Sequence, residues 1–541
     1  MYSLRNMQNG MSTGCYRGQV KVRKLTIDNL NIEVRAGTTI LEAAGLLGIE
    51  IPAMCFLSGY KPSTSCMLCV VKIIGKTGLV PACGMKVEDG MLVQTDTQEV
   101  AEARRAALEL LLSDHIGDCL GPCQVTCPAG MNIPLMIRQI ARGDLSGAIE
   151  TIKKDIALPA VLGRICPAPC EKACRRRAYD QAVAVCLLKR YAADIDLASE
   201  QPYLPVCKPS SGKHVAIAGA GPAGLSAAYY LQRKGHQVTC FDENDRAGGM
   251  LRYGVDKKLL PETVLDKETR MIFGLGAIFK GDTKIGTDIS VQYLAADFDA
   301  VFIASGPIQN DDPAWSSLEK GQKSIAINTG SYETSLKGVF AGGDCVGRRK
   351  LAVRAAAHGK EAAVSIDQYL SGKPVTGAEK EFNSRIGKLR DDEINNFLRN
   401  ASDSPREVPA GKYDGFEPEQ AQREAQRCLH CDCRKPVDCK LRRYATEYGA
   451  RQNRYKNERR LFTQKVQHPD VIYEPGKCIK CGLCIQIAAE AKEQLGLTFI
   501  GRGFDVQVAV PFGRSIAEGL KKAAAKCVQS CPTGALAFKN I

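Results

Sequence analysis

The 541-residue chain lacks an apolar run long enough to span a membrane, and nothing in it resembles a secretory signal peptide. We therefore expect a cytoplasmic protein whose 24 cysteines are not used for disulfides. The chain also lacks a Ser/His/Asp or paired-carboxylate arrangement for acid–base chemistry, which leaves no candidate catalytic side chain. No nucleic-acid-binding motif accompanies the net charge of +14, which is dispersed along the chain.

The cysteines fall in short, regular runs, as ligands of metals and iron–sulfur clusters do. The first run has C-x10-C-x2-C-x13-C spacing and predicts a [2Fe–2S] cluster, with zinc as the alternative. Its members are Cys55, Cys66, Cys69 and Cys83. The segment resembles the N-terminal ferredoxin domain of the largest peripheral subunit of complex I and of iron-only hydrogenases. That resemblance implies a β-grasp fold.

Residues 214–242 show a second pattern: an apolar run, a glycine turn, a helical stretch, another apolar run and an acid. The turn has G-x-G-x-x-G spacing and consists of Gly219, Gly221 and Gly224. Such glycines let the backbone approach a pyrophosphate at a helix N-terminus, and Asp242 can bond a ribose hydroxyl. The pattern predicts a Rossmann-like dinucleotide site.

Two further segments resemble the flavoprotein small subunit of glutamate synthase and imply that the dinucleotide is FAD. Residues 246–254 are similar to the flavin-side loop of that family, and residues 334–344 to the segment that closes the FAD site. The resemblance adds four cofactor-binding residues, namely Gly249, Arg252, Gly343 and Asp344. Asp344 is expected on the ribityl chain.

The NADPH-binding domain of that family has no counterpart in this sequence. Only 31 residues separate Gly306 from Gly338, where the family inserts the domain, whereas a nucleotide-binding domain needs on the order of 100 residues. No second unit of strand, G-x-G-x-x-G turn and helix occurs in the chain. We predict that the chain alone does not bind NAD(P)H, and that residues 307–333 or a partner subunit cover the exposed flavin face.

Two runs of C-x3-C-x3-C spacing resemble the part of the glutamate synthase small subunit that holds two [4Fe–4S] clusters. The runs are Cys119, Cys123 and Cys127, and Cys166, Cys170 and Cys174. They supply six of the eight ligands needed, and His115 and Cys186 lie at or beside the two remaining places of the family pattern. The predicted partition places one cluster on His115, Cys119, Cys123 and Cys174, and the other on Cys127, Cys166, Cys170 and Cys186.

Two more cysteine groups follow the flavin region. A compact set predicts a [4Fe–4S] cluster or a structural zinc, and consists of Cys428, Cys431, Cys433 and Cys439. The opening and the ending of a bacterial-ferredoxin run retain the ligands of one [4Fe–4S] cluster, namely Cys478, Cys481, Cys484 and Cys531. The sequence between them also resembles the complex I and hydrogenase family.

The predicted fold class is multidomain, α/β and α+β. It combines a β-grasp [2Fe–2S] ferredoxin, a helical double-cubane domain, a Rossmann-like FAD domain and a C-terminal ferredoxin-like [4Fe–4S] domain. The expected boundaries are a leader at 1–20, the ferredoxin at 21–98, the helical domain at 99–205, the FAD domain at 211–372, a linker at 373–420, a Cys-rich basic segment at 421–470 and the last domain at 471–541. An organelle transit segment is the alternative interpretation of the leader.

These resemblances imply an electron-transfer subunit of a multi-subunit NAD(P)H- and ferredoxin-linked oxidoreductase, of the electron-bifurcating hydrogenase, formate dehydrogenase or transhydrogenase type. The implied partners are a complex I-type FMN- and NADH-binding subunit, a thioredoxin-like [2Fe–2S] subunit, a hydrogenase or formate dehydrogenase subunit, and ferredoxin. The basic stretch 440–465 is either a solvated helix face or a docking surface for such an acidic partner. The alternative function is a self-sufficient NADPH-dependent glutamate synthase small subunit or NADPH–ferredoxin oxidoreductase.

Overall fold

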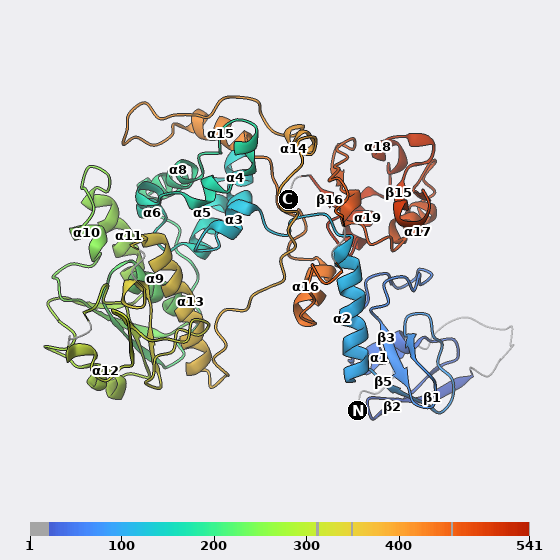
Figure 1. The fold of residues 1–541 in the computed structure, drawn as a ribbon, viewed down its shortest axis with the longest axis horizontal. Helices are drawn as coiled ribbons and strands as arrows, with labels where there is room; N and C mark the ends of the chain where they lie inside the picture. Colours follow the sequence, from blue (N-terminus) through green and yellow to red (C-terminus); the bar gives the residue numbers. More distant parts are fainter. Residues whose placement is uncertain (1–20, 310–312, 348–349, 456–457, 540–541) are drawn as a thin grey trace, which may run out of the picture. The chain divides into compact units, whose positions relative to one another are not determined.

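The computed structural model describes residues 21–309, 313–347, 350–455 and 458–539 (Figure 1). The expected leader at 1–20 lies outside the described residues. The chain folds as two compact units. The first unit comprises residues 1–115, 437–460 and 465–541, and the second comprises residues 116–436 and 461–464. The predicted Cys-rich basic segment is therefore divided between the units.

The first unit begins with a five-stranded sheet in the order β2-β1-β5-β3-β4. Its strands are β1 (Val22–Ile27), β2 (Leu30–Arg35), β3 (Val70–Ile73), β4 (Leu79–Pro81) and β5 (Met91–Gln94). Strand β1 pairs parallel with β5, and the other pairs are antiparallel. Helix α1 (Ile40–Leu46) begins after Thr39, which forms a capping box with Glu42, and it packs on the sheet. A mixed sheet covered by a helix is the expected β-grasp arrangement.

Helix α2 (Gln98–Ser113) leads away from this sheet. The remaining part of the first unit contains two short antiparallel strand pairs with small helices around them. Its elements are α16 (Lys440–Glu447), β13 (Val471–Tyr473), α17 (Leu483–Glu490), β14 (Thr498–Ile500), β15 (Gln507–Ala509), α18 (Ile516–Gly519), α19 (Ala524–Ser530) and β16 (Leu536–Phe538). A core that includes Val471, Ile487 and Leu536 joins β13, α17, β15, α18, α19 and β16, and α16 packs against α2.

The second unit opens with a helical segment that has its own apolar core. Its helices are α3 (Pro122–Thr126), α4 (Ile133–Ala141), α5 (Leu145–Asp155), α6 (Pro159–Ile165), α7 (Pro169–Lys172) and α8 (Val185–Ala198). Helices α6 and α8 approach closely, because a Cβ added at Gly163 would lie 2.7 Å from the Cβ of Arg190. Prolines begin or interrupt four of these six helices, which keeps them short.

A parallel sheet in the order β12-β9-β6-β7-β8 follows in the second unit. The strands are β6 (His214–Ala218), β7 (Gln237–Phe241), β8 (Ile278–Lys280), β9 (Ala300–Ile303) and β12 (Val339–Ala341). The helices are α9 (Pro222–Arg233), α10 (Met250–Tyr253), α11 (Glu262–Gly274), α12 (Val291–Asp297) and α13 (Ala352–Leu370). This parallel sheet with crossover helices agrees with the Rossmann-like prediction.

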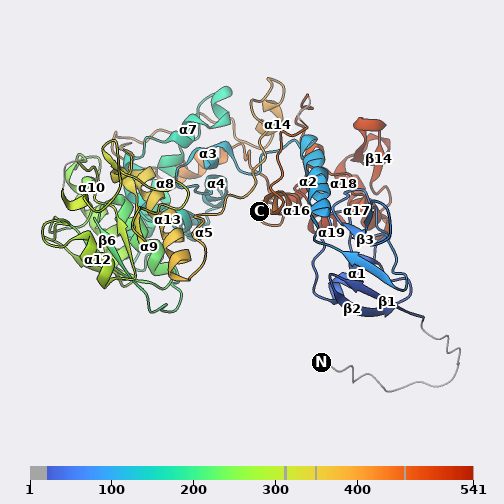
Figure 2. The same ribbon diagram turned by 60° about the horizontal axis from the view of Figure 1, so that its bottom comes forward.

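Helices α9 and α13 lie side by side, as Figures 1 and 2 show. The Ser226 hydroxyl donates to the Ala356 carbonyl at 2.6 Å, and a Cβ at Gly359 would lie 2.1 Å from the Ala223 carbonyl oxygen. The two helices can be this close only because residue 359 is glycine. Their packing fixes the first turns of both helices relative to the sheet.

The predicted linker also contributes buried residues to the second unit. It contains α14 (Ile394–Leu398) and leads to α15 (Pro418–Gln426). Ile386 and Phe397 are buried, and the ring of Phe397 stacks on that of Phe462 at 4.5 Å between centroids. Among the helices of the described residues, none combines the length and the apolarity needed to cross a lipid bilayer.

Candidate functional site

The carboxyl ends of the parallel strands border a cavity of about 930 Å³. Gly219 and Gly221, between β6 and α9, line it. Gly219 has a φ of +107°, and a Cβ there would lie 2.5 Å from the Ala304 carbonyl oxygen, so a side chain cannot fit. No atom lies within 4 Å of a Cβ built on Gly221, so this backbone is open to the cavity. The N-terminus of α9 thus has both the space and the N–H groups that a pyrophosphate needs.

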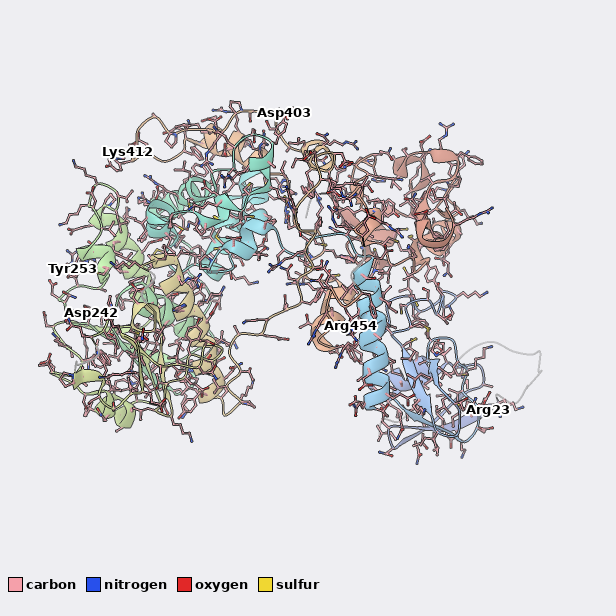
Figure 3. All side chains as sticks on the ribbon, in the orientation of Figure 1. Arg23, Asp242, Tyr253, Asp403, Lys412 and Arg454 are labelled. Carbon is pink, nitrogen blue, oxygen red and sulfur yellow. The ribbon has the colours of Figure 1, made fainter. Side chains whose placement is uncertain are left out.

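The third glycine of the turn has a packing role. A Cβ at Gly224 would lie 1.9 Å from the Gly219 carbonyl oxygen, so glycine lets α9 approach the turn. Asp242 follows β7 and lines the cavity (Figure 3). One of its carboxylate oxygens accepts from the Ala220 N–H at 2.7 Å, and the other accepts from the Asn244 N–H at 3.0 Å. The glycine turn and the acid are therefore held in one hydrogen-bonded arrangement.

The other predicted FAD residues divide into two groups. Gly249, Gly343 and Asp344 line the cavity, together with Tyr253 of α10. Gly249 has a φ of +50°, and a Cβ there would lie 3.0 Å from the Cα of Gly221. This close approach brings the flavin-side loop and the glycine turn to one site, as expected.

Arg252 is placed differently from the prediction. Its side chain is buried and does not line the cavity. Its Nε donates to the Ala247 carbonyl at 2.9 Å, and its Nη2 pairs with Asp266 at 2.6 Å. These bonds tie the loop to α11, so the structure gives Arg252 a supporting role. A sequence shows an arginine in a flavin-side loop, but it does not show that α11 presents a carboxylate to it.

Part of the interval between Gly306 and Gly338, where the sequence predicts that the family's NADPH domain is missing, lies against the cavity. Pro307, Ile308, Pro313 and Trp315 line it, and Trp315 is buried in the core beside β9 and β12. A two-stranded hairpin, β10 (Lys320–Gly321) and β11 (Ser324–Ile325), follows. Cover of the flavin face by residues 307–333 or by a partner subunit stays a prediction. The glycine turn, the acid and the cavity volume together fit a dinucleotide such as FAD.

The first four predicted cysteine ligands lie together in the first unit, all buried. The sulfur atoms of Cys55 and Cys66 are 3.4 Å apart, and Cys83 is hydrogen bonded to both Cys55 and Cys69. Backbone N–H groups of Ser65 and Cys66 point at the Cys55 sulfur. Thr64 and Met67 adopt positive φ angles of +51° and +52°, which turns the loop around these sulfurs. Four buried thiols with N–H donors fit a [2Fe–2S] cluster.

Thiol set A, by which we mean Cys127, Cys166, Cys170 and Cys186, surrounds one small pocket of the second unit. Cys186 is hydrogen bonded to both Cys166 and Cys170. The other lining residues are apolar apart from Lys189. These four cysteines are the ones predicted for the second cubane, and the structure brings them together.

Thiol set B consists of Cys123, Cys174, Cys428 and Cys431, and it differs from the predicted first cubane. Burial raises the pKa of the Cys123 thiol well above its ordinary value, and the neighbouring thiols of Cys428, Cys431 and Cys174 raise it further. Two of these four thiols, Cys428 and Cys431, belong to the separate compact set that the sequence predicts. The cause is long-range packing, because α15 lies on α4 and delivers the segment that follows it.

An ion pair fixes that segment. Arg138 of α4 donates to both carboxylate oxygens of Asp432 at 3.0 Å each, and both side chains are buried. Arg175 pairs in the same pocket with Asp118. The predicted compact set of Cys428, Cys431, Cys433 and Cys439 is therefore divided, since its first two members belong to set B. Among the described residues, no three His, Cys, Asp or Glu side chains converge as they would on a single metal ion.

Thiol set C, by which we mean Cys478, Cys481, Cys484 and Cys531, lines an apolar pocket of the first unit, as predicted for the ferredoxin-like cubane. The Cys55 thiol lies close enough to Cys481 to raise its pKa, after the larger effects of burial, Cys531 and Cys478. The Ser63 hydroxyl donates to the Cys481 carbonyl at 2.7 Å. The [2Fe–2S] site and set C are thus neighbours within the first unit.

Four predicted ligands remain outside these sets: His115, Cys119, Cys433 and Cys439. Burial, and then Lys477, lowers the pKa of His115 to about 3. The Cys119 sulfur lies 3.3 Å from the Ser384 hydroxyl, and its carbonyl accepts from the Cys433 N–H at 3.2 Å. Cys439 precedes α16 and is buried. Their ligand roles stay predictions.

Three family models match this chain. They are a 2Fe-2S iron-sulfur cluster binding domain at residues 21–98, the 4Fe-4S cluster domain II of dihydropyrimidine dehydrogenase at 91–201, and an NAD(P)-binding Rossmann-like domain at 217–280. The multidomain prediction is confirmed. The [2Fe–2S], [4Fe–4S] and dinucleotide-binding domains follow one another in the expected order.

Curated relatives confirm the resemblance to the glutamate synthase small subunit. The glutamate synthase [NADPH] small chain of Bacillus subtilis is 37% identical over 34% of this chain and 38% of its own length. The beta subunit of NADP(+)-dependent formate dehydrogenase from Moorella thermoacetica is 37% identical over 40% of this chain and 33% of its own. The beta subunit of NADPH-Fe(3+) oxidoreductase from Geobacter sulfurreducens is 37% identical over 37% and 30%. This chain spans less than half the length of these relatives.

Proposed function

We propose that this chain is the FAD- and iron–sulfur-containing electron-transfer subunit of a multi-subunit NAD(P)H- and ferredoxin-linked oxidoreductase. The domain order supports the proposal, and the matched relatives are named as oxidoreductase subunits. The complex would be of the electron-bifurcating hydrogenase, formate dehydrogenase or transhydrogenase type. Its partners would be a complex I-type FMN- and NADH-binding subunit, a thioredoxin-like [2Fe–2S] subunit and ferredoxin.

One observation carries the proposal. In the first turn of α13, Val353 lines the pocket of thiol set A, and Ala355 lines the dinucleotide cavity. Both residues are buried, so no bulk solvent lies between the two sites at this turn. A helix with its side chains is roughly 10 Å across, so one helix thickness separates them. A cubane held by set A would be the direct electron-transfer neighbour of the flavin.

The chemistry that FAD supplies when bound is the exchange between two-electron and one-electron transfer. This chain's residues do the rest by binding and orientation. The N-terminus of α9 and the glycine turn would hold the pyrophosphate, and Asp242 would hold a ribose hydroxyl. Trp315 and its neighbours cover part of the cavity and limit the access of water to it.

The proposal includes that the chain alone does not oxidise NAD(P)H. Among the described residues, the cavity beside α9 is built on the one glycine turn of this kind, and FAD would occupy its helix N-terminus. The test is stopped-flow mixing of the isolated, oxidised full chain with NADH, NADPH and then dithionite. We expect no flavin bleaching with either nucleotide and full bleaching with dithionite.

A second candidate function is an NADPH oxidoreductase that needs no partner, because all three relatives carry NADP(H) in their names. The same experiment separates the two functions. Fast bleaching by either nucleotide would establish the second candidate and overturn the proposed absence of a nicotinamide site. Lack of any flavin in the purified chain would overturn both.

A further inference from the structure

A buried lysine beside thiol set A has no acidic partner among the described residues. Lys189 is 4% exposed and lies three residues after Cys186 on α8, on the same helix face. It is the one charged side chain among the described residues that line the pocket of set A. Its Nζ donates to the Leu162 carbonyl at 3.1 Å, which satisfies one of its three donors.

Three other buried cations at cluster sites are paired. Arg138 at thiol set B forms a two-bond ion pair with Asp432, and Arg175 pairs with Asp118. Lys477, which precedes the first cysteine of thiol set C, pairs with Glu474. Arg434, buried two residues after Asp432, leaves its Nε and one Nη without a hydrogen-bond partner. Lys189 differs from all of these cations because, among the described residues, it is the one charged side chain that lines the pocket of set A.

A buried ammonium without a counter-charge is strongly unfavourable, so this position requires negative charge close by. The four cysteines of set A line the same pocket as Lys189, and as thiolate ligands of an iron–sulfur cluster they would supply it. Lys189 is thus placed to face an anionic cluster.

We propose that Lys189 sets the reduction potential of the cubane held by thiol set A. This inference rests on the proposed function, which places a [4Fe–4S] cluster there. One-electron reduction adds a negative charge to a cluster that is already anionic, and a fixed cation in a low-dielectric pocket stabilises the product. Lys189 therefore raises the potential of this cubane above that of the same cluster without it. With this higher potential, the cubane next to the flavin takes up one electron from the reduced flavin more readily.

The test is an EPR-monitored redox titration of the anaerobically purified full chain. Cys186→Ala identifies the signal of the set A cubane as the one that is lost. Lys189→Met removes the charge at similar volume, and Lys189→Gln removes it but retains an N–H donor for Leu162. We expect the reduction equilibrium constant to fall about tenfold or more in both variants, which is a shift of about 59 mV to lower potential.

Two controls make the result specific. The [2Fe–2S] signal of the same sample should keep its potential, since Lys189 belongs to the other unit. Lys153→Met is the matched variant, because Lys153 is also 4% exposed but pairs with Asp196 at 2.5 Å, and it should leave the set A midpoint unchanged.

An unchanged set A midpoint in a folded Lys189 variant would overturn the inference. Loss of this cubane from both variants would also overturn it, because the lysine would then be structural. Absence of the signal from the wild-type chain would instead refute the proposed function.

Discussion

Thiol sets A and B of the second unit differ in the buried charges beside them. Set B has two ion pairs, Arg138 with Asp432 and Arg175 with Asp118, and the buried Arg434 nearby. Thiol set A has a single cation, Lys189, and otherwise apolar walls. Two clusters of the same type can thus be given different potentials by the pairing of one side chain, without a change of ligand type. The three predictions below test this contrast, from the largest expected effect to the smallest.

The largest effect should follow from removal of the distant ligands of set B. Cys428→Ser with Cys431→Ser should cost about four iron atoms per chain, because a cubane cannot be held by two thiolates. Set A should keep its cubane, since none of its ligands changes. Iron analysis and EPR of anaerobically purified protein measure both outcomes.

Cys207→Ser provides the control for that loss. Cys207 belongs to none of the thiol sets, and its sulfur lies 4.0 Å from the Pro205 carbonyl oxygen. The wild-type chain should contain about 14 iron atoms from the [2Fe–2S] site and sets A, B and C. About 18 iron atoms would show one further cubane in the chain. Iron that is unchanged in the double variant would refute set B.

Asp432→Asn should make the pocket of set B resemble that of set A. It leaves the buried Arg138 unpaired, which should destabilise the second unit by about 3–5 kcal/mol. The same change should raise the potential of the set B cubane. Denaturant unfolding followed by flavin fluorescence measures the first effect, and redox titration the second. The double variant Arg138→Met/Asp432→Asn should recover most of the stability; a further loss would contradict the ion-pair interpretation.

The smallest effect is the pH dependence of stability that arises at α6, the helix that ends next to Cys166 of set A. Glu268 accepts from the N–H groups of Ala160 and Val161 at the start of α6, at 2.7 and 2.9 Å. Burial raises its pKa from 4.5 to about 7. The folded chain therefore binds more protons than the unfolded chain between these values, and stability falls as pH rises through this window.

The size of this pH effect is at most about 3 kcal/mol, at about 1.36 kcal/mol per pKa unit. The glutamine in Glu268→Gln cannot ionise, so the free energy of unfolding of this variant should change less with pH. Denaturant midpoints of both chains at pH 5 and pH 8 measure it. If the denaturant midpoint changes equally between pH 5 and pH 8 in wild type and variant, Glu268 is not the cause of the pH dependence.

Local features of the fold were predictable from the sequence because the residues that determine them are close together in the chain. Thr39 and Glu42 cap α1, and the glycine turn with Asp242 lies within one strand–helix–strand unit. The four members of set A were predicted from the two C-x3-C-x3-C runs and from Cys186. These patterns depend on helix and strand periodicity and on fixed ligand spacing, which a single sequence displays.

Set B could not be predicted in this way. Its ligands come from residues 123, 174, 428 and 431, and the contact between α4 and α15 that joins them has no local signature. The pairing of Arg252 with Asp266 of α11 has no local signature either. One signal was available: an Asp follows Cys431 directly, and an acid next to a ligand of a buried cluster would need a cation close by.

The wide separation of the set B ligands also orders the maturation of the protein. Synthesis proceeds from the N-terminus at about 5–20 residues per second, so the cysteines of set A leave the ribosome roughly tens of seconds before Cys428 and Cys431. A cubane held by set A can therefore be inserted while the chain is still being made. The second cubane must wait until α15 has docked on α4, so two cysteines of set B stay without their partners during that interval. Iron–sulfur delivery to set B can therefore begin only after residue 431 has been made, whereas all four cysteines of set A are available earlier.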